Sequence, residues 1–272
     1  MPERGTERTA EGGEAQVLVT GRYRARLAAC DNDLRRAQVL RYRAFIAAPA
    51  AGRRGGKSEA PSVPPAREGD AHDAICRHVL IEESRTGRLV SCFRVLPLAG
   101  GHAVARSYSA RHYDLSPLSG HEGPMLEIGR FCVTPHERDP DILRVALGAL
   151  AKFAQRHRAG LLFGCASFRG ADAAAHAEAL ALIAARHLAP RRWRVGVRAP
   201  EVVRFAGWPA PADPKRAFRG LPPMLRSYLA LGGWVSDHAV IDRQMDTLHL
   251  FAVLEVQALP AARRRRLLAL AG

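Results

Sequence analysis

The sequence predicts a single mixed α/β domain with one central sheet, and two observations lead to that prediction. Segments with strand character at residues 78–81 and 89–98 follow one another closely, as in an antiparallel hairpin. Segments with helical periodicity at residues 31–47 and 139–157 alternate with strands instead of forming a block of their own. The chain can build the core that this fold needs, because 47% of its 272 residues are hydrophobic.

The N-terminal region begins with a polar segment that precedes the first regular elements. Residues 1–15 are rich in Gly and Glu, which predicts a disordered terminus. Residues 16–28 alternate weakly between apolar and polar side chains and predict a first strand. The helix predicted over residues 31–47 has a suitable capping residue in Asp31 or Asn32.

A long basic stretch, residues 48–70, separates this helix from the hairpin. It has no periodicity and is punctuated by Gly and Pro, which predicts a mobile loop. Loops of this length inside a domain are often lids or binding loops. Thr86 and Gly87 then mark the hairpin turn, and residues 126–133 predict a further strand.

The second half of the chain continues the alternation of helices and strands. Its predicted elements are a helix at 139–157, a buried strand at 161–166, helices at 172–187 and 223–231, and an antiparallel pair at 234–240 and 247–256. We therefore expect one domain over residues 16–258. A basic C-terminal helix over residues 259–272, which contains Arg263–Arg266, is expected to follow it.

The chain is strongly basic, with 41 Lys and Arg residues against 26 Asp and Glu residues and a net charge of +15. Nucleic acid, anionic lipid and an acidic carrier protein are the partners that such a charge could serve. The alternative is that an Arg-rich, Ala-rich composition reflects only a GC-rich genome. No motif or aromatic stacking pattern typical of nucleic-acid binding accompanies the charge, so a basic nucleic-acid-binding protein remains the non-enzymatic alternative.

The cysteines predict free thiols in a reducing compartment. Their number is odd, none forms a CxxC pair, and most lie in apolar runs: Cys30, Cys76, Cys92, Cys132 and Cys165. The N-terminus lacks the apolar stretch of a signal peptide, and no run has the length of a membrane span. We therefore expect a cytoplasmic protein, with peripheral contact to the inner face of the cytoplasmic membrane as an open alternative. The histidines show no metal-ligand spacing.

Glu127 and Arg130 interrupt the apolar strand at residues 126–133. Charges in such a strand need a partner or a function, because an unpaired buried charge is costly. Residues three apart on a regular strand point to opposite faces, but Gly129 could mark a bulge that changes this. The structural alternative to a catalytic role is an ion pair of Glu127 with Arg94 or Arg41.

Four motifs stand in a fixed order along the chain. Arg41 and Phe45 lie on the first helix, a D-x-x-D pair ends the long loop, an F-R-x-L-P run forms the second hairpin strand, and an E-x-x-R pair follows; the residues concerned are Arg41, Phe45, Asp70, Asp73, Arg94, Glu127 and Arg130. This order resembles the branch of the GNAT-like superfamily that contains acyl-homoserine lactone synthases and ornithine N-acyltransferases.

Further stretches resemble the ornithine N-acyltransferases within that branch: residues 105–109, 113–115, 164–168 and 221–229. The lactone synthases usually carry a Trp near the loop after the first helix, and residues 46–69 contain none. Residues 236–239 depart from the Gly-Glu-Pro-Ala that the family often has there, so an N-acyltransferase with another amino-acid acceptor stays an alternative. So does a lactone synthase that uses S-adenosylmethionine.

The resemblance implies a GNAT-like acyl-CoA N-acyltransferase fold, with a central mixed, mostly antiparallel sheet flanked by helices. It implies transfer of a 3-hydroxyacyl chain from acyl carrier protein to the α-amine of L-ornithine, which gives lyso-ornithine lipid. The donor group would be the carrier protein's 4'-phosphopantetheine, with no metal and no tightly bound cofactor.

The resemblance also assigns expected roles to residues. Glu127 and Arg130 would be catalytic, with Glu127 as general base. The substrate-binding residues would be Arg41, Phe45, Asp70, Asp73 and Arg94. The residues that bind the acyl chain or pantetheine would be Phe131, Cys132, Val133 and Arg138.

Overall fold

The computed structural model describes residues 17–19, 21–49 and 66–269. Its main sheet has, in the described part of the chain, the strand order β1-β2-β3-β4-β6-β7-β11-β10-β9. The strands are β1 Val17–Val19, β2 Tyr23–Leu27, β3 Arg77–Glu83, β4 Leu89–Leu98, β6 Met125–Val133, β7 Leu161–Arg169, β9 Val202–Arg204, β10 Trp234–Asp242 and β11 Thr247–Glu255. Only β6 and β7 pair in parallel, which confirms the mixed, mostly antiparallel sheet.

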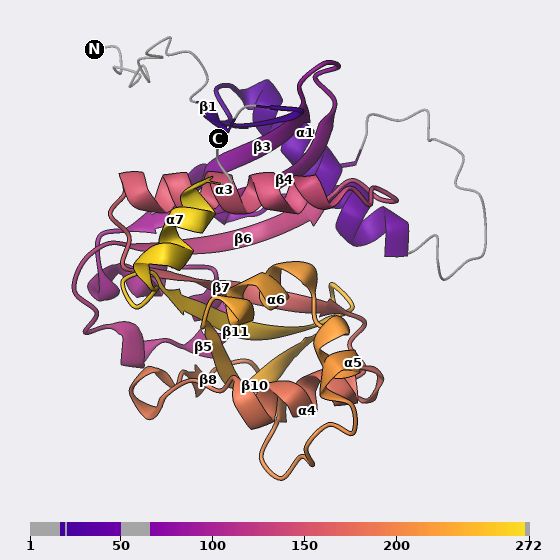
Figure 1. Ribbon diagram of the computed structural model, residues 1–272. Helices are drawn as coiled ribbons and strands as arrows, with labels where there is room; N and C mark the ends of the chain where they lie inside the picture. The colour runs from indigo at the N-terminus through magenta and orange to yellow at the C-terminus, as the bar shows by residue number, and fades with distance from the viewer. Residues whose placement is uncertain (1–16, 20, 50–65, 270–272) are drawn as a thin grey trace, which may run out of the picture.

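Helices cover both faces of this sheet (Figure 1). They are α1 Asp31–Tyr42, α3 Pro140–Arg156, α4 Ala177–Arg186, α5 Pro214–Arg219, α6 Pro223–Ala230 and α7 Ala261–Ala269. Residues on α3, α4, α5 and α6 share one large hydrophobic core with the sheet. The other face is covered by α1 over β3, β4 and β6, and by residues 99–120 with the small pair β5 Tyr113–Asp114 and β8 Gly196–Val197.

Three local predictions need correction. The first strand is two short strands, β1 and β2, and Gly21 between them has φ +148°, a conformation that favours glycine. Neither Asp31 nor Asn32 caps α1, because Cys30 occupies the cap position and its side chain makes no capping hydrogen bond. Helix α5 and strands β5, β8 and β9 were not predicted, since all of them are short.

Several other predictions of helices and strands are confirmed within the described residues. The hairpin β3–β4, the strand β6, the helix α3 and the late pair β10–β11 lie where they were expected. Asp139 caps α3 by accepting a hydrogen bond from the Asp141 N–H at 2.9 Å. Most of the predicted loop at 48–70 lies outside the described residues, and so does the predicted disordered N-terminus. No helix in the described ranges has the length and hydrophobicity to cross a membrane.

The predicted bulge in β6 is present, one residue beyond Gly129. Cys92 of β4 pairs with Cys132 and Arg94 pairs with Gly129, so Arg130 and Phe131 together face one residue of β4. Arg130, at φ +54°, adopts the left-handed conformation. This inserted residue breaks the two-residue alternation of the strand, which decides where the Arg130 side chain points.

Strands β6 and β7 begin side by side and then diverge. Their parallel pairing joins Met125–Glu127 to Leu161–Phe163 and goes no further. At the end of this ladder Gly164 lies against β6, where a β-carbon would lie 2.1 Å from the Ile128 carbonyl oxygen. Only glycine therefore allows the two strands to approach so closely before they part.

Substitution Gly164→Ala is expected to destabilise the protein by about 3 kcal/mol, because the new methyl group must push β6 and β7 apart. Chemical denaturation measures the change in the free energy of unfolding. Gly120→Ala is the matched control, since a β-carbon there meets nothing within 4 Å, and it should change stability little. Equal stability of the two variants would show that the contact at Gly164 relaxes freely.

Candidate active site

Six charged side chains meet where α1, β4 and the bulge of β6 come together. The three cationic residues are Arg41 on α1, Arg94 on β4 and Arg130 in the bulge. The three acidic residues lie between α1 and β3: Glu68, Asp70 and Asp73. The sequence motifs are thus brought into one cluster, which we call the arginine–acid network.

Arg94 and Arg130 link the network through Asp70. Arg94 donates to the Asp70 carboxylate at 2.6 and 2.9 Å and to Asp73 at 2.7 Å. Arg130 donates to Asp70 at 3.0 Å and to Glu68 at 2.9 Å. Arg41 is 1% exposed and bonds Asp73 at 2.8 Å as well as Glu68. Each carboxylate is therefore held by two guanidinium groups, which makes the network rigid before any substrate binds.

The network keeps its acidic members ionised. Burial alone would raise the pKa of Asp73, but hydrogen bonds from Arg41 and Gln38 outweigh it and lower that pKa well below its usual range. At Asp70 burial is again opposed, here by the hydrogen bond and charge of Arg94, and the pKa is lowered. Any substrate that binds here must therefore form hydrogen bonds with arginine and carboxylate side chains that are already paired with one another.

Glu68 was missed by the sequence analysis, although it bonds both Arg41 and Arg130. It lies near the end of a stretch that was interpreted as a mobile loop, and it is only 8% exposed. The available signal was its spacing, since Glu68, Asp70 and Asp73 form an acidic run directly before a strand.

Glu127 is buried on β6, beside the last paired residues of the β6–β7 ladder. Its carboxylate accepts hydrogen bonds from the Tyr108 N–H at 2.8 Å, the Ser109 N–H at 2.7 Å and the Ser109 hydroxyl at 2.6 Å. The suggested ion pair with Arg94 or Arg41 is wrong, because those arginines bond the network acids instead. Backbone donors, which sequence patterns do not show, satisfy the charge.

Tyr108 connects Glu127 to the network. Its backbone bonds Glu127, and the Arg130 guanidinium carbon lies 4.7 Å from its ring centroid. Arg94 lies over the same ring at 5.7 Å. The bulge thus brings Arg130 and Glu127 to one side of β6, around a single aromatic ring. Tyr108 was noted only as part of a motif, and its position was not predicted.

Two histidines, the half-buried His112 and the buried His249, extend the site beyond Tyr108. The ring of His112 lies 5.1 Å from that of Tyr108 and 5.0 Å from that of His249 on β11. Burial, with the nearby charges of His112 and Arg130, lowers the pKa of His249 to about 3. His249 is therefore neutral at physiological pH.

The tautomer of His249 follows from its contacts with Tyr113. The single Tyr113 hydroxyl proton goes to the His249 carbonyl oxygen at 2.8 Å, so the ring Nδ1 at 3.2 Å must be the donor to that hydroxyl. This leaves Nε2 as an acceptor, and it has no hydrogen-bond partner among the described residues. Neither histidine was predicted from the sequence: His112 lies in a connector between Arg111 and Tyr113, and His249 lies alone among apolar residues of a strand.

Comparison with known proteins identifies the family of this chain. Residues 40–147 match the model of the acetyltransferase (GNAT) domain. An L-ornithine N(alpha)-acyltransferase of Rhodobacter capsulatus is 32% identical over 247 residues, which cover 89% of this chain and 93% of that protein. One from Rhizobium meliloti is also 32% identical, over 85% of this chain and 79% of its own length. The chain belongs to the L-ornithine N(alpha)-acyltransferase family. It therefore has the GNAT-like fold of an acyltransferase.

Two solved structures are similar to this chain at low sequence identity. The structure of FeeM, an N-acyl amino acid synthase from uncultured soil microbes, is 9% identical and covers 88% of this chain and 95% of its own, with a TM-score of 0.43. TofI, solved in a ternary complex with an inhibitor and MTA, is 17% identical over 94% of this chain and 99% of that one, with a TM-score of 0.45.

The other residues expected to bind substrate lie around the diverging strands of this acyltransferase. Phe131 packs against Phe93, with ring centroids 6.2 Å apart, and joins the large core. Cys132 faces α1, with its sulfur 3.6 Å from that of Cys92, and Phe45 packs against the same cluster. Arg138 is exposed shortly before α3. In the described residues no group of His, Cys, Asp and Glu is arranged to hold a metal ion.

The thiols near the site are expected to be unreactive, which favours direct acyl transfer over a cysteine-bound intermediate. Burial raises the pKa of Cys165 to about 12 and that of Cys76 to about 12, so both are protonated at neutral pH. Brief alkylation of the native protein with iodoacetamide should modify the exposed Cys30 first, as measured by peptide mass spectrometry. Rapid labelling of Cys165, or loss of activity in Cys165→Ala, would contradict this prediction.

Proposed function

We propose that this protein transfers a 3-hydroxyacyl chain from acyl carrier protein to the α-amine of L-ornithine, giving lyso-ornithine lipid. The observation that carries the proposal is the position of Glu127, a buried carboxylate where the β6–β7 ladder ends, beside a preformed arginine–acid network. Family membership supplies the reaction type. L-ornithine as the acceptor and acyl carrier protein as the donor are our proposal.

The first step requires a free amine. An α-amine has a pKa of roughly 8, so a proton must leave the ammonium before the nitrogen can attack. The Glu127 Oε2 accepts one hydrogen bond, from Tyr108, and a carboxylate oxygen can accept two. That oxygen can therefore take the proton directly or through a water molecule, which supports Glu127 as the general base.

The nitrogen then attacks the thioester carbonyl carbon, the C–S bond breaks, and the pantetheine thiolate leaves and takes up a proton. The oxyanion formed on the way needs preorganised donors. We assign this role to backbone N–H groups of β6 around Phe131, Cys132 and Val133, where β7 no longer pairs with β6. The pantetheine phosphate would lie near Arg138 and the N-terminus of α3, because helix N-termini favour anions.

Ornithine carries one carboxylate and a second ammonium group, and the arginine–acid network offers partners for both. Arg94 and Arg41 suit the carboxylate, and Asp70 and Asp73 suit the side-chain ammonium. Phe45, three residues beyond the end of α1, would line the approach to the network. These arginines and acids already bond one another, so a bound substrate must replace some of those hydrogen bonds with its own. A zwitterion can do so, because its carboxylate replaces an acid and its ammonium group replaces an arginine.

The test is an assay of the purified protein with 3-hydroxyacyl carrier protein and a panel of amino acids. We expect thiol release and an N-acyl product with ornithine alone. Activity only with another amino acid would keep the chemistry and overturn the acceptor. A lactone formed from S-adenosylmethionine would favour the lactone synthase alternative. No thiol release with any acceptor, together with DNA binding at near-physiological salt, would favour the nucleic-acid-binding alternative.

The basic surface suits two partners of this reaction, an acidic carrier protein and an anionic membrane surface. We propose that the enzyme works in the cytoplasm, with peripheral contact to the inner face of the cytoplasmic membrane, since its product is an amphiphile. Nucleic acid has no place in this reaction. Cell fractionation at low and high salt measures the membrane-bound share.

A further inference from the structure

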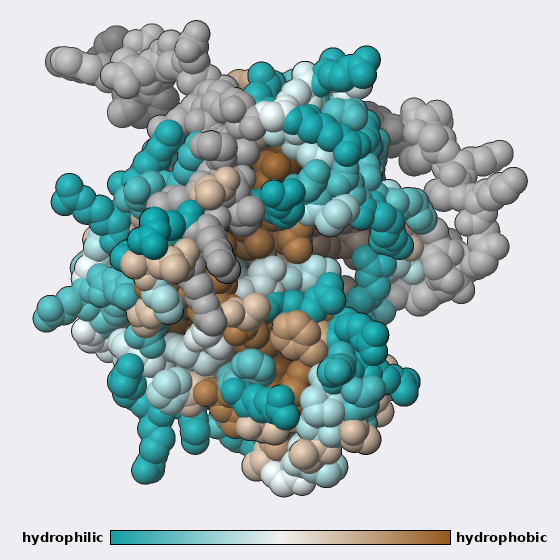
Figure 2. All heavy atoms as spheres, viewed as in Figure 1, coloured by the Kyte–Doolittle hydropathy of each residue, from teal (hydrophilic) through white to brown (hydrophobic). Residues whose placement is uncertain are grey.

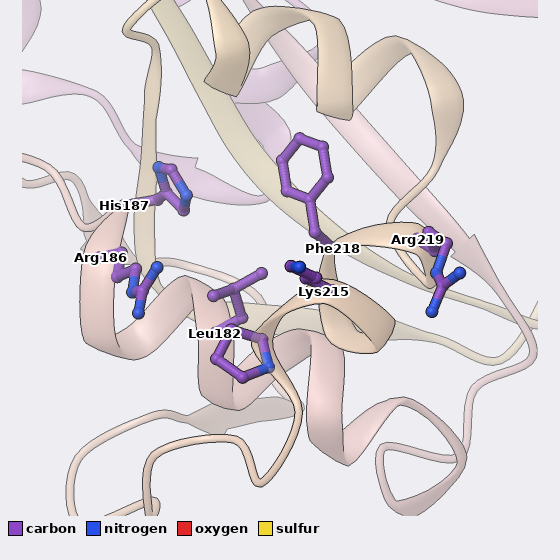
Figure 3. Close-up of a pocket in the computed structure, with 7 residues that line it drawn as sticks. Leu182, Arg186, His187, Lys215, Phe218 and Arg219 are labelled. Atoms are coloured by element: carbon purple, nitrogen blue, oxygen red, sulfur yellow. The ribbon is translucent and has the colours of Figure 1, made fainter.

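A cavity of about 590 Å³ lies between α4 and α5. Leu182 and Phe218 form apolar parts of its lining, and Arg186, Lys215 and Arg219 stand around it (Figure 3). Helices α4 and α5 are far apart in the sequence, but they pack against each other and share one hydrophobic core with the sheet. In Figure 1 this part of the molecule lies on the opposite side from the basic helix α7.

The three cations around this cavity have no anionic partner among the described residues. No ion pair joins Arg186, Lys215 or Arg219 to a carboxylate, and no acidic residue lines the cavity. The neighbouring Asp213 caps α5, where its carboxylate accepts hydrogen bonds from the backbone N–H groups of Lys215 and Arg216. The cavity therefore combines an apolar lining with uncompensated positive charge, and an external anion would balance that charge.

An uncharged loop adjoins the cavity. Residues 206–212, between β9 and α5, contain no charged side chain. Trp208 is half-buried, with its ring 6.3 Å from that of Phe205, whereas Pro209 and Ala210 are exposed. Figure 2 shows pale and brown residues, with few hydrophilic ones, at the end of the molecule below α4 and α5. An aromatic anchor and small apolar residues beside cations are typical of surfaces that rest in a membrane interface.

We propose that α4, α5 and the 206–212 loop form a docking surface for a bilayer containing anionic phospholipid. The lipid phosphates bind Arg186, Lys215 and Arg219, while the loop and the apolar part of the cavity contact the acyl boundary. The inference extends the proposed function, in which the product is an amphiphile that must enter a membrane. An acidic carrier protein would match the cations, but it would leave the apolar cavity and the uncharged loop unused.

The test measures partition of the full-length protein onto vesicles of phosphatidylcholine, with and without phosphatidylglycerol. We expect binding only with the anionic lipid, and weaker binding at high salt. The double variant Lys215→Gln, Arg219→Gln should bind about 30-fold more weakly, because each cation near the surface contributes about 1 kcal/mol. The matched control, Arg264→Gln with Arg265→Gln on α7, removes the same charge elsewhere and should bind as the wild type does.

A second variant tests the loop without changing the cavity. Ala210→Asp places a charge on an exposed position and should weaken partition several-fold while the thermal midpoint stays unchanged. Equal losses in the α5 and α7 double variants would overturn the proposal in favour of net charge alone. Unchanged partition in the α5 variant with a raised KM for acyl carrier protein would also overturn it and assign the surface to that protein. Because partition requires no turnover, failure of the acyltransferase assay would be a separate result.

Discussion

Glu127→Gln is expected to lower the rate of acyl transfer by about 10²- to 10⁴-fold, the range that general-base catalysis contributes. The amide that replaces the carboxylate cannot take a proton from the ornithine ammonium. Its size is nearly the same, so the buried position on β6 stays filled. The measurement is thiol release from 3-hydroxyacyl carrier protein under saturating ornithine, with circular dichroism to verify the fold.

The base role must be separated from a positioning role, because Glu127 also holds residues 108 and 109 in place. Ser109→Ala removes one of the three donors to the carboxylate and leaves the acid itself intact. We expect this control to lose far less activity than Glu127→Gln. If the two variants lost activity equally, or if the rate of Glu127→Gln stayed low at high pH, where the ornithine amine is already free, Glu127 would be a structural partner.

Arg94→Met is expected to destabilise the protein by about 3–5 kcal/mol, the usual cost of removing one partner from a buried ion pair. Arg94 is 3% exposed, and its loss leaves Asp70 and Asp73 with fewer donors inside the protein. Chemical denaturation reports the stability, and the activity assay reports the site. The same substitution at Arg243, whose pair with Glu201 is exposed, should cost less than about 1 kcal/mol.

Arg94→Met should also be more sensitive to acid than the wild-type protein. The pKa values of Asp70 and Asp73 are lower in the folded protein than in the unfolded chain. Their contribution to stability is therefore present above the unfolded value, roughly pH 4, and is lost as the pH falls through the folded values. Arg94 is one of the causes of the lowered values, so Arg94→Met should shift the acid-unfolding midpoint to higher pH. A midpoint equal to that of the wild type would show that Arg41 and Arg130 compensate.

The sequence alone was sufficient to predict the helices and strands that have a local periodic pattern. Strand and helix periodicity predicted the hairpin, β6, α3 and the late strand pair, because burial of one face imposes that periodicity. The motif order predicted that Arg41, Asp70, Asp73, Arg94 and Arg130 belong to one site, and the structure brings these five together. It did not predict that they bond one another.

The tertiary structure alone decided how the charges are satisfied. Glu127 bonds backbone N–H groups of a segment 18 residues away, and backbone donors leave no trace in a residue pattern. Glu68 was not predicted because it lies at the end of a Gly/Pro-rich stretch that was interpreted as a loop. His249 was not predicted because a single polar residue in a buried strand usually has a structural role.

The left-handed conformation of Arg130 was not predicted, because the adjacent Gly129 was the more obvious position for a bulge in the strand. Local sequence thus determined most of the helices and strands, the family resemblance and five of the six residues of the arginine–acid network. The long-range packing of β4, β6 and the segment at residues 66–120 determined which charge meets which. That pairing depends on register and on one inserted residue, and side-chain periodicity along a single strand reports neither.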